Sequence, residues 1–426
     1  MPQENSLFTH SEMGGIELSD VIEAYYSCRR RKRSTVNARR FELNWEAECV
    51  SLWEDINNGT YKPRRSIAFI VDKPKPREIF AADFRDRVVH HLLIGRIYPL
   101  LEKQFILDSY STQKDKGTLF GVRRVEQMMR ECSENYTRDC YVLKIDIQSF
   151  FMNIPRQRLY ECLEHFMQEK YHGNDRETLM WLFRETLFNR CEHGCVIRCP
   201  RRKWKVLPPG KSLMRSDGTH GLPIGNLTSQ MMALLYLDEL DHNVTEQWGI
   251  RYYGRYVDDM VLMDLSKQKL LQVNGLIREW LRSRGLSLHP NKLYLQHYGK
   301  GVLFVGGMVL PGRKYVSRRT MTNCLHTIRR LNVCAGCDDA DREQYREAFR
   351  ATLNSYLGMF RHYDSLRFGK RVCGIIARSW YKKMYVKVRG RKMKVVLRKS
   401  DNSENTLLRK GILSVNDRER VDRATA

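Results

Sequence analysis

Hydrophobic and polar positions change their spacing along the chain, and these changes divide it into four segments. The first is helical in pattern, because apolar residues recur at helical spacing over 41–56. The second mixes short apolar runs with helical stretches, the third carries long helical patterns that include 345–360, and the last is basic. The pattern therefore predicts an α+β body with helical flanks and a basic end, over residues 1–62, 63–317, 318–378 and 379–426.

Individual elements can be predicted within the α+β segment. Asp83 and Asp86 have the spacing of a helix-capping box, and the apolar stripe that follows them predicts a helix that ends near Pro99. Prolines at 74 and 76 predict a turn between two apolar runs. The predicted strands are 66–71, 79–82, 141–146, 252–257 and 260–263.

Composition adds a class of partner to this picture. The chain has 426 residues, of which 42% are hydrophobic, so it can bury a sizeable core. It carries 74 Lys and Arg against 49 Asp and Glu, a formal net charge of +25. So large an excess of positive charge favours a polyanionic partner, with nucleic acid first.

The cysteines and apolar runs predict the environment of the protein. Twelve cysteines in so long a chain are too sparse for a disulfide scaffold and are expected as reduced thiols. The first residues are polar and contain no apolar signal-peptide core, and the apolar run 231–237 is too short to span a bilayer. We expect a cytoplasmic protein with no membrane partner.

Three carboxylates are the candidate chemistry. Asp146 ends a predicted strand, and Asp258 and Asp259 lie at the tip of a predicted hairpin. If the hairpin lies beside Asp146, the three side chains can hold two Mg²⁺ ions, with Mn²⁺ as an alternative. Such a metal pair activates a 3′-hydroxyl and stabilises a pyrophosphate leaving group, which is nucleotidyl transfer.

The hairpin sequence Tyr256-Val257-Asp258-Asp259 resembles the Tyr-x-Asp-Asp motif of reverse transcriptases. The stretch after Asp146, which reads Ile-Gln-Ser-Phe-Phe, resembles the first catalytic motif of the same family. The resemblance implies that the Ile147 backbone carbonyl also binds metal and that Phe151 excludes a ribose 2′-hydroxyl. It further implies a right-hand polymerase in which 63–317 form fingers and palm and 318–378 a helical thumb.

Other motifs of that family follow in the expected order. The turn around Lys73, Lys75 and Arg77 resembles the fingers hairpin that holds the nucleoside triphosphate, and either lysine could be the phosphate ligand. Lys292 resembles a residue that protonates pyrophosphate. The resemblance places further contacts to the nucleotide at Ile224 and Gly225, and to template or primer at Lys75, Tyr110, Gly117, Gln230 and Gly306.

The stretch from Ile224 to Gln230, Ile-Gly-Asn-Leu-Thr-Ser-Gln, resembles the template-contact motif of diversity-generating retroelement reverse transcriptases. This subtype implies error-prone copying of template adenines into cDNA during mutagenic retrohoming. It also implies a template RNA from the same locus and a small, basic, oligomeric accessory variability protein. Retron-like and group II intron-like reverse transcriptases remain alternatives, as does a non-catalytic RNA-binding or maturase-like protein.

Two basic regions are open to more than one interpretation. Cys191, Cys195 and Cys199 with His193 have ligand types that zinc accepts, but the run at 201–205 favours a basic insertion that faces nucleic acid. Residues 381–399 carry nine Lys or Arg and no acid, which fits a β-hairpin, an arm along phosphate, or a solvated tail.

Overall fold

The computed structural model describes residues 15–30, 35–72, 75–333, 339–377, 380, 384–390 and 392–397. Its described residues form two compact units. The first runs to Val305 and includes Leu310–Gly312, and the second consists of Gly306–Val309 and the chain from Arg313 onward. The division thus falls before the predicted boundary at 317, and the N-terminal helices belong to the same unit as the α+β body. The assignment of fingers, palm and thumb to the predicted segments remains a prediction.

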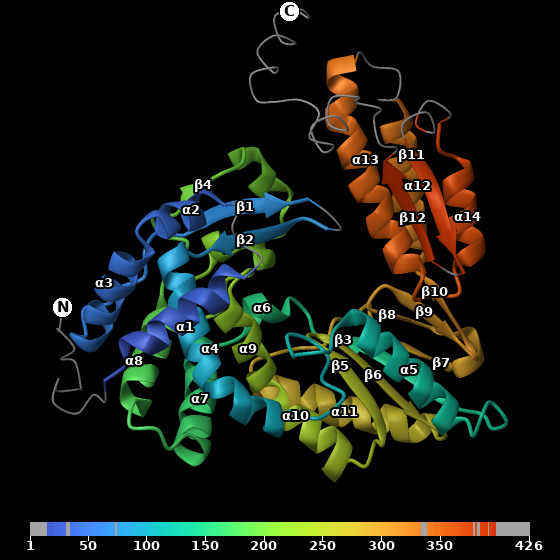
Figure 1. The fold of residues 1–426 in the computed structure, drawn as a ribbon. Coiled ribbons are helices and arrows are strands. Elements are labelled where there is room, and N and C mark those ends of the chain that lie inside the picture. Colours follow the sequence, from blue (N-terminus) through green and yellow to red (C-terminus); the bar gives the residue numbers. More distant parts are fainter. Residues whose placement is uncertain are drawn as a thin grey trace, which may run out of the picture. The chain divides into compact units, whose positions relative to one another are not determined.

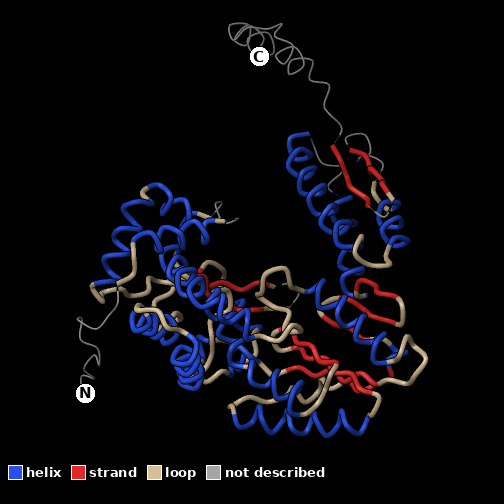
Figure 2. Tube along the Cα trace, turned by 60° about the horizontal axis from the view of Figure 1, so that its bottom comes forward, coloured by secondary structure: helices blue, strands red, loops and turns tan. Residues whose placement is uncertain are grey.

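A four-stranded antiparallel sheet lies at the centre of the first unit (Figures 1 and 2). Its order is β5-β6-β3-β7, where β5 is Tyr252–Tyr256, β6 is Asp259–Asp264, β3 is Tyr141–Asp146 and β7 is Tyr294–His297. Helices α5 (Thr118–Cys132) and α11 (Lys267–Ser283) pack against it. The fold is α+β, as predicted, and the strands β3, β5 and β6 confirm the predicted runs.

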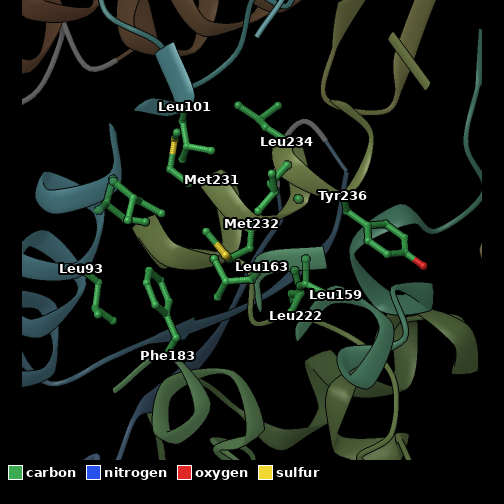
Figure 3. Packing of buried hydrophobic residues seen from close by; sticks show 14 of the residues in the cluster. Leu93, Leu101, Leu159, Leu163, Phe183, Leu222, Met231, Met232, Leu234 and Tyr236 are labelled. Carbon is green, nitrogen blue, oxygen red and sulfur yellow. The ribbon is translucent and has the colours of Figure 1, made fainter. Parts of the chain in front are cut away.

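Beside the sheet, four helices share one hydrophobic core: α4 (Phe84–Gln104), α7 (Arg156–Lys170), α8 (Arg176–Phe188) and α9 (Leu227–Tyr236). Figure 3 shows Met231 and Met232 of α9 among leucines and Phe183 from the surrounding elements. Helix α9 is apolar nearly all round, which is the pattern of a helix buried on every side. Its burial fixes the position of the loop that precedes it.

Helix α4 corrects one prediction. It begins after Asp83, whose side chain accepts the Arg85 backbone N–H, but it continues through Pro99 to Gln104. Proline removes one backbone donor from a helix, and here tertiary packing of Ile97 and Leu101, both fully buried, holds the last turn in place.

The N-terminal helices and a small sheet complete the first unit. Helix α1 (Leu18–Arg29) packs along α4, and α2 (Val36–Leu43) and α3 (Trp45–Asn57) lie beside them. The small sheet has the order β2-β1-β4, in which β1 (Ile67–Val71) pairs antiparallel with β2 (Arg77–Ala81) and parallel with β4 (Val196–Ile197). The remaining elements of the unit are α6 (Phe150–Asn153), η1 (Arg201–Val206), η2 (Pro209–Lys211), η3 (Leu213–Arg215), α10 (Asp238–His242), η4 (Asn243–Gln247), η5 (Tyr298–Lys300) and β8 (Val302–Phe304).

The second unit is mainly helical. It contains β9 (Gly307–Leu310), β10 (Arg313–Val316), α12 (Arg318–Val333), α13 (Asp339–Phe360), α14 (Leu366–Gly374), β11 (Met384–Arg389) and β12 (Lys392–Leu397). Strands β11 and β12 form an antiparallel hairpin on α13, where the Asn354 amide donates to the Val395 carbonyl at 2.9 Å and accepts its N–H at 2.7 Å. The hairpin interpretation of the basic stretch is therefore confirmed, and residues 398–426 of the predicted tail lie outside the described residues. No described helix is long and apolar enough to cross a membrane.

Candidate active site

The three predicted carboxylates come together at one end of the central sheet. Asp146 ends β3 and stands directly opposite Asp259, the first residue of β6. Asp258 occupies the two-residue turn between β5 and β6. Val257, the other turn residue, has φ = 58°, a left-handed conformation that is strained for a β-branched residue. This strained turn contains Asp258, and Asp259 follows it directly.

Backbone hydrogen bonds join the loops around these carboxylates. The Ile147 N–H donates to the Asp258 carbonyl at 3.1 Å, and the His289 N–H donates to the Asp146 carbonyl at 2.8 Å. The Gln148 N–H donates to the Ser287 carbonyl at 2.9 Å. Backbone hydrogen bonds therefore hold together the end of β3, the hairpin turn and the segment before β7.

Two lysines supply the nearest positive charges. Lys292 Nζ donates to Asp146 Oδ1 at 2.6 Å, and Lys144 Nζ lies 3.0 Å from Asp259 Oδ1. Burial raises the pKa of Asp259 to about 6 against the opposing effect of Lys144, and Asp258 and Asp146 raise it further. Burial, followed by the charge of Asp146, also raises the pKa of Asp258. Burial and mutual repulsion thus both disfavour the charged forms of Asp258 and Asp259.

A fully buried ion pair stabilises the hairpin formed by β5 and β6. Arg255 on β5 donates through Nε to Asp241 Oδ1 at 2.7 Å and through Nη2 to the other carboxylate oxygen, and both side chains are 0% exposed. The Tyr253 hydroxyl donates to Asp241 at 2.7 Å. Arg255 Nη1 donates to the Val257 carbonyl at 3.1 Å, so the same guanidinium fixes the strained turn.

The carboxylates are oxygen ligands of the kind that divalent cations bind, although the described residues do not form a complete metal site. Among the described residues, no three Asp, Glu, His or Cys side chains are gathered at coordinating distance. Asp259 Oδ1 is buried 3.0 Å from the Lys144 ammonium, and no other donor in the described part of the chain bonds it. Hard oxygen ligands that raise one another's pKa are the donor set that Mg²⁺ prefers. Asp146, Asp258 and Asp259 would hold such a cation, which would replace the lysine contacts of Asp146 and Asp259.

The small sheet brings the predicted phosphate-binding hairpin to the same region. Arg77 begins β2 with an exposed side chain, and its charge lowers the pKa of Asp258. Lys75 is exposed in the turn, whereas Lys73 lies outside the described residues. The Phe80 N–H of β2 donates to the Ile224 carbonyl at 3.1 Å. Gly225 has φ = 119°, and a Cβ there would come within 3.1 Å of Ile79, so glycine is required at this crossing.

The remaining predicted contacts fall in several places. Phe151 in α6 is half-buried, and its carbonyl accepts the Leu222 N–H at 2.7 Å, which joins it to the loop that contains Ile224. Gln230 is exposed on α9 and accepts the Thr112 hydroxyl at 3.3 Å. Gly117 precedes α5 with φ = 134°. Gly306, with φ = 88°, belongs to the second unit.

The prediction for Tyr110 is wrong for its side chain. Its ring is 0% exposed, and its hydroxyl donates to Asp108 Oδ1 at 3.0 Å. Gly121 and Gly254 make room for the ring, since a Cβ at either position would clash with it. Tyr110 is therefore a packing residue and cannot contact template or primer through its side chain.

Among the described residues, the segment 191–199 does not bring three metal-binding side chains together. Cys191 is buried in a small core with Phe80 and Leu213, and the Cys199 sulfur lies 3.3 Å from the Ile70 N–H. Cys334 and Cys337 lie outside the described residues.

Sequence reasoning missed three residues of the site: Lys144, Arg255 and Asp241. Lys144 shares a strand face with Asp146, which is the only sequence signal for its role. Arg255 lies one residue before the Tyr-x-Asp-Asp motif, but its partner Asp241 is identified only by the fold.

A family model and a bacterial protein each match more than half of the chain. The family model described as reverse transcriptase (RNA-dependent DNA polymerase) matches residues 70–309. Protein YkfC of Escherichia coli K12 is 22% identical over 319 residues, which cover 65% of this chain and 75% of that protein.

Among solved structures, an apo telomerase of Candida tropicalis truncated from its C-terminal domain has 12% identity and a TM-score of 0.43, covering 59% of this chain and 55% of that one. A telomerase of Candida albicans in complex with a fragment of telomeric RNA has 11% identity and a TM-score of 0.40, covering 75% and 56%. The chain spans a little over half the length of these two proteins.

Proposed function

The chain belongs to the reverse transcriptase (RNA-dependent DNA polymerase) family, so its enzyme class is that of the RNA-directed DNA polymerases, and on this premise we propose that it copies a template RNA into cDNA at Asp146, Asp258 and Asp259. The observation that carries the proposal is the pairing of Asp146 with Asp259 across β3 and β6, with Asp258 in the adjoining turn. Two Mg²⁺ ions held there would activate the primer 3′-hydroxyl and stabilise the departing pyrophosphate.

The chain's own residues would position the nucleotide. Arg77, with its exposed guanidinium, suits bidentate contact with the triphosphate, and Lys75 or Lys73 would add a second cation. Phe151 would close the site against a ribose 2′-hydroxyl. Lys292, which donates to Asp146 in the structure, would turn to the pyrophosphate and give it a proton.

The finer proposal is that copying is error-prone at template adenines, as in diversity-generating retroelements. Its support is the Ile224 side chain, which is half-buried beside Gly225 while its carbonyl is bonded to β2. An isoleucine offers the nascent base pair an apolar surface with no donor or acceptor, so a mismatched pair loses no hydrogen bond there. One such contact typically changes discrimination by about 1–3 kcal/mol, or roughly five- to 150-fold.

Two partners belong to this proposal. One is a structured template RNA, which the net charge of +25 suits. The other is a small, basic, oligomeric accessory variability protein, which rests on the resemblance of the 224–230 motif alone.

Substitution of Asp258 by Asn tests the core of the proposal. The change keeps the shape of the side chain and removes the charge that binds metal, so primer extension on an RNA template should fall by orders of magnitude while RNA affinity is retained. Asp264→Asn at the other end of β6 is the matched control, because Asp264 bonds Ser266 and Lys269 away from the cluster. Near-normal extension by Asp258→Asn contradicts the assignment, and absence of extension by the unaltered protein favours a non-catalytic RNA-binding role.

Sequencing of cDNA copied from one defined RNA tests the subtype. Errors should be enriched at template adenines and reduced in Ile224→Gln, which restores a donor and an acceptor at that position. Equal error rates at all four bases contradict the mutagenic proposal and leave reverse transcription standing.

A further inference from the structure

A second cationic surface lies on the small sheet. We call residues 193–216 the basic platform: they carry seven Lys or Arg and no Asp or Glu. The platform joins the sheet through β4, where the Val196 N–H donates to the Ser66 carbonyl at 2.8 Å and the Arg198 N–H donates to the Ala68 carbonyl at 2.9 Å. The strand order β2-β1-β4 places β4 at one edge of the sheet, and later residues of the platform reach β2, the strand that begins with Arg77, through Glu78.

The buried carboxylate of Glu78 anchors the platform to the small sheet. Glu78 of β2 is 1% exposed, and three donors of the platform bind it: Trp204 Nε1 at 2.6 Å, the Ser212 hydroxyl at 2.7 Å and the Leu213 N–H at 2.6 Å. A buried carboxylate with three donors is a strong anchor, since loss of any donor leaves charge uncompensated in the interior. The platform is thus held in one position although its own positive charges repel one another.

The cations of the platform point outward. Six of them have exposed side chains: Arg198, Arg201, Arg202, Lys205, Lys211 and Arg215. The seventh, Lys203, forms an ion pair with Asp72 at 2.6 Å, and within the described part of the chain it is the only platform cation that pairs with a carboxylate. Six exposed cations on an anchored segment produce a positive potential that attracts a polyanion. Because the segment is already held in place, binding costs little conformational entropy.

We propose that the basic platform binds the phosphate backbone of the template RNA outside the catalytic cleft. The inference rests on the proposed function for the identity of the RNA and goes beyond it in naming a second contact surface. An RNA strand suits the platform because phosphate contacts need no particular base order and the exposed groups are Lys and Arg without an accompanying acceptor. Trp204 packs against the small core of Phe80 and Leu213, and its indole N–H donates to Glu78, so the contact is made mainly by the exposed charges.

The platform and Arg77, the predicted triphosphate-binding residue, belong to one sheet. RNA held along β4 is coupled through β1 to the hairpin that carries Arg77. We therefore expect the platform to increase retention of long templates without changing the chemistry of nucleotide addition.

The test compares two triple variants of equal charge in the full-length protein. The platform variant is Arg201→Gln/Arg202→Gln/Lys205→Gln, and the control is Lys267→Gln/Arg278→Gln/Arg282→Gln, which removes three exposed cations from α11. Affinity for a long single-stranded RNA is measured over a series of salt concentrations. Removal of three phosphate contacts should lower the slope of log K against log salt by about 2 and weaken binding roughly 10- to 100-fold at moderate salt, with a much smaller change in the control.

Primer extension on a hybrid with a short template separates this inference from the proposed function. Both triple variants should extend it at the rate of the unaltered protein, because it does not reach the platform. Equal losses of RNA affinity in the two triple variants overturn the platform and leave only net charge. RNA binding by the platform variant that equals that of the unaltered protein also overturns it and points to an acidic protein partner. Absence of extension by the unaltered protein contradicts the proposed function alone, since the difference in RNA binding still decides the platform.

Discussion

Replacement of either member of the buried Arg255–Asp241 pair should damage stability and catalysis to different extents. Asp241→Asn leaves a fully buried guanidinium without its counter-ion, and breaking a buried pair in this way costs about 3–5 kcal/mol. Typical domains have about 5–15 kcal/mol of stability in total, so the variant should still fold but with a much lower denaturant midpoint. Burial next to Asp241 raises the pKa of Tyr253, so that hydroxyl cannot supply the missing charge.

The double variant Asp241→Leu/Arg255→Met separates support of the fold from support of the turn. Removing both charges leaves no uncompensated ion and should recover most of the stability. It leaves the Val257 carbonyl without its guanidinium donor, so the turn that holds Asp258 is less constrained. Misplacement of a catalytic group by about 1 Å can cost roughly 100-fold in rate, and we expect a loss of that order in single-turnover extension.

Urea unfolding and single-turnover primer extension measure the two effects. Arg138→Met is the control, since its pair with Glu134 is more than half exposed and such pairs are worth about 0–1 kcal/mol. A loss below about 1 kcal/mol in Asp241→Asn would refute the role of the pair in stability. Full activity in the double variant would refute the role of Arg255 in holding the turn.

Three further results are expected. Burial raises the pKa of Asp86 from 3.8 to about 7, so between these pH values the folded chain keeps a proton that the unfolded chain has released. The free energy of unfolding of the unaltered protein, relative to that of Asp86→Asn, should therefore fall from pH 4 to pH 7 by at most about 1.4 kcal/mol per pH unit. Urea unfolding of both proteins over this pH range measures the difference. Glu78→Ala leaves three buried donors without an acceptor, so trypsin should cleave within 198–215 several-fold faster, and unchanged cleavage would contradict the anchor. Lys144→Met removes the cation beside Asp259, so added Mg²⁺ should raise the melting temperature more than it does in the unaltered protein, and an equal rise would show that Lys144 does not compensate the cluster.

The local pattern of the sequence was sufficient to predict the central hairpin and β3, because strand-forming runs end directly at the acids. It also indicated the helical nature of 318–378, which became α12, α13 and α14. Local pattern could not predict the role of Arg255 on β5, whose partner Asp241 lies on α10, or the burial of Tyr110, which depends on Gly121 and Gly254 leaving space. These features arise from contacts between distant segments, and apolar periodicity carries no information about them.

The same limit explains two boundaries. A proline favours the end of a helix, yet packing of Ile97 and Leu101 carries α4 through Pro99. The division between the two units falls at Val305, inside a run of short strands whose composition does not change there.

The backbone hydrogen bonds around Asp146 affect how this enzyme can diverge in sequence. The bonds made by the N–H groups of Ile147, Gln148 and His289 survive any substitution except proline, because no side chain takes part in them. Selection can therefore alter Gln148 and His289, which lie outside the buried core, for template, partner or host while the three acids keep their places, whereas the buried Ile147 has to stay apolar. Saturation mutagenesis should show broad tolerance at Gln148 and His289, with proline depleted, beside near-complete intolerance at the acids.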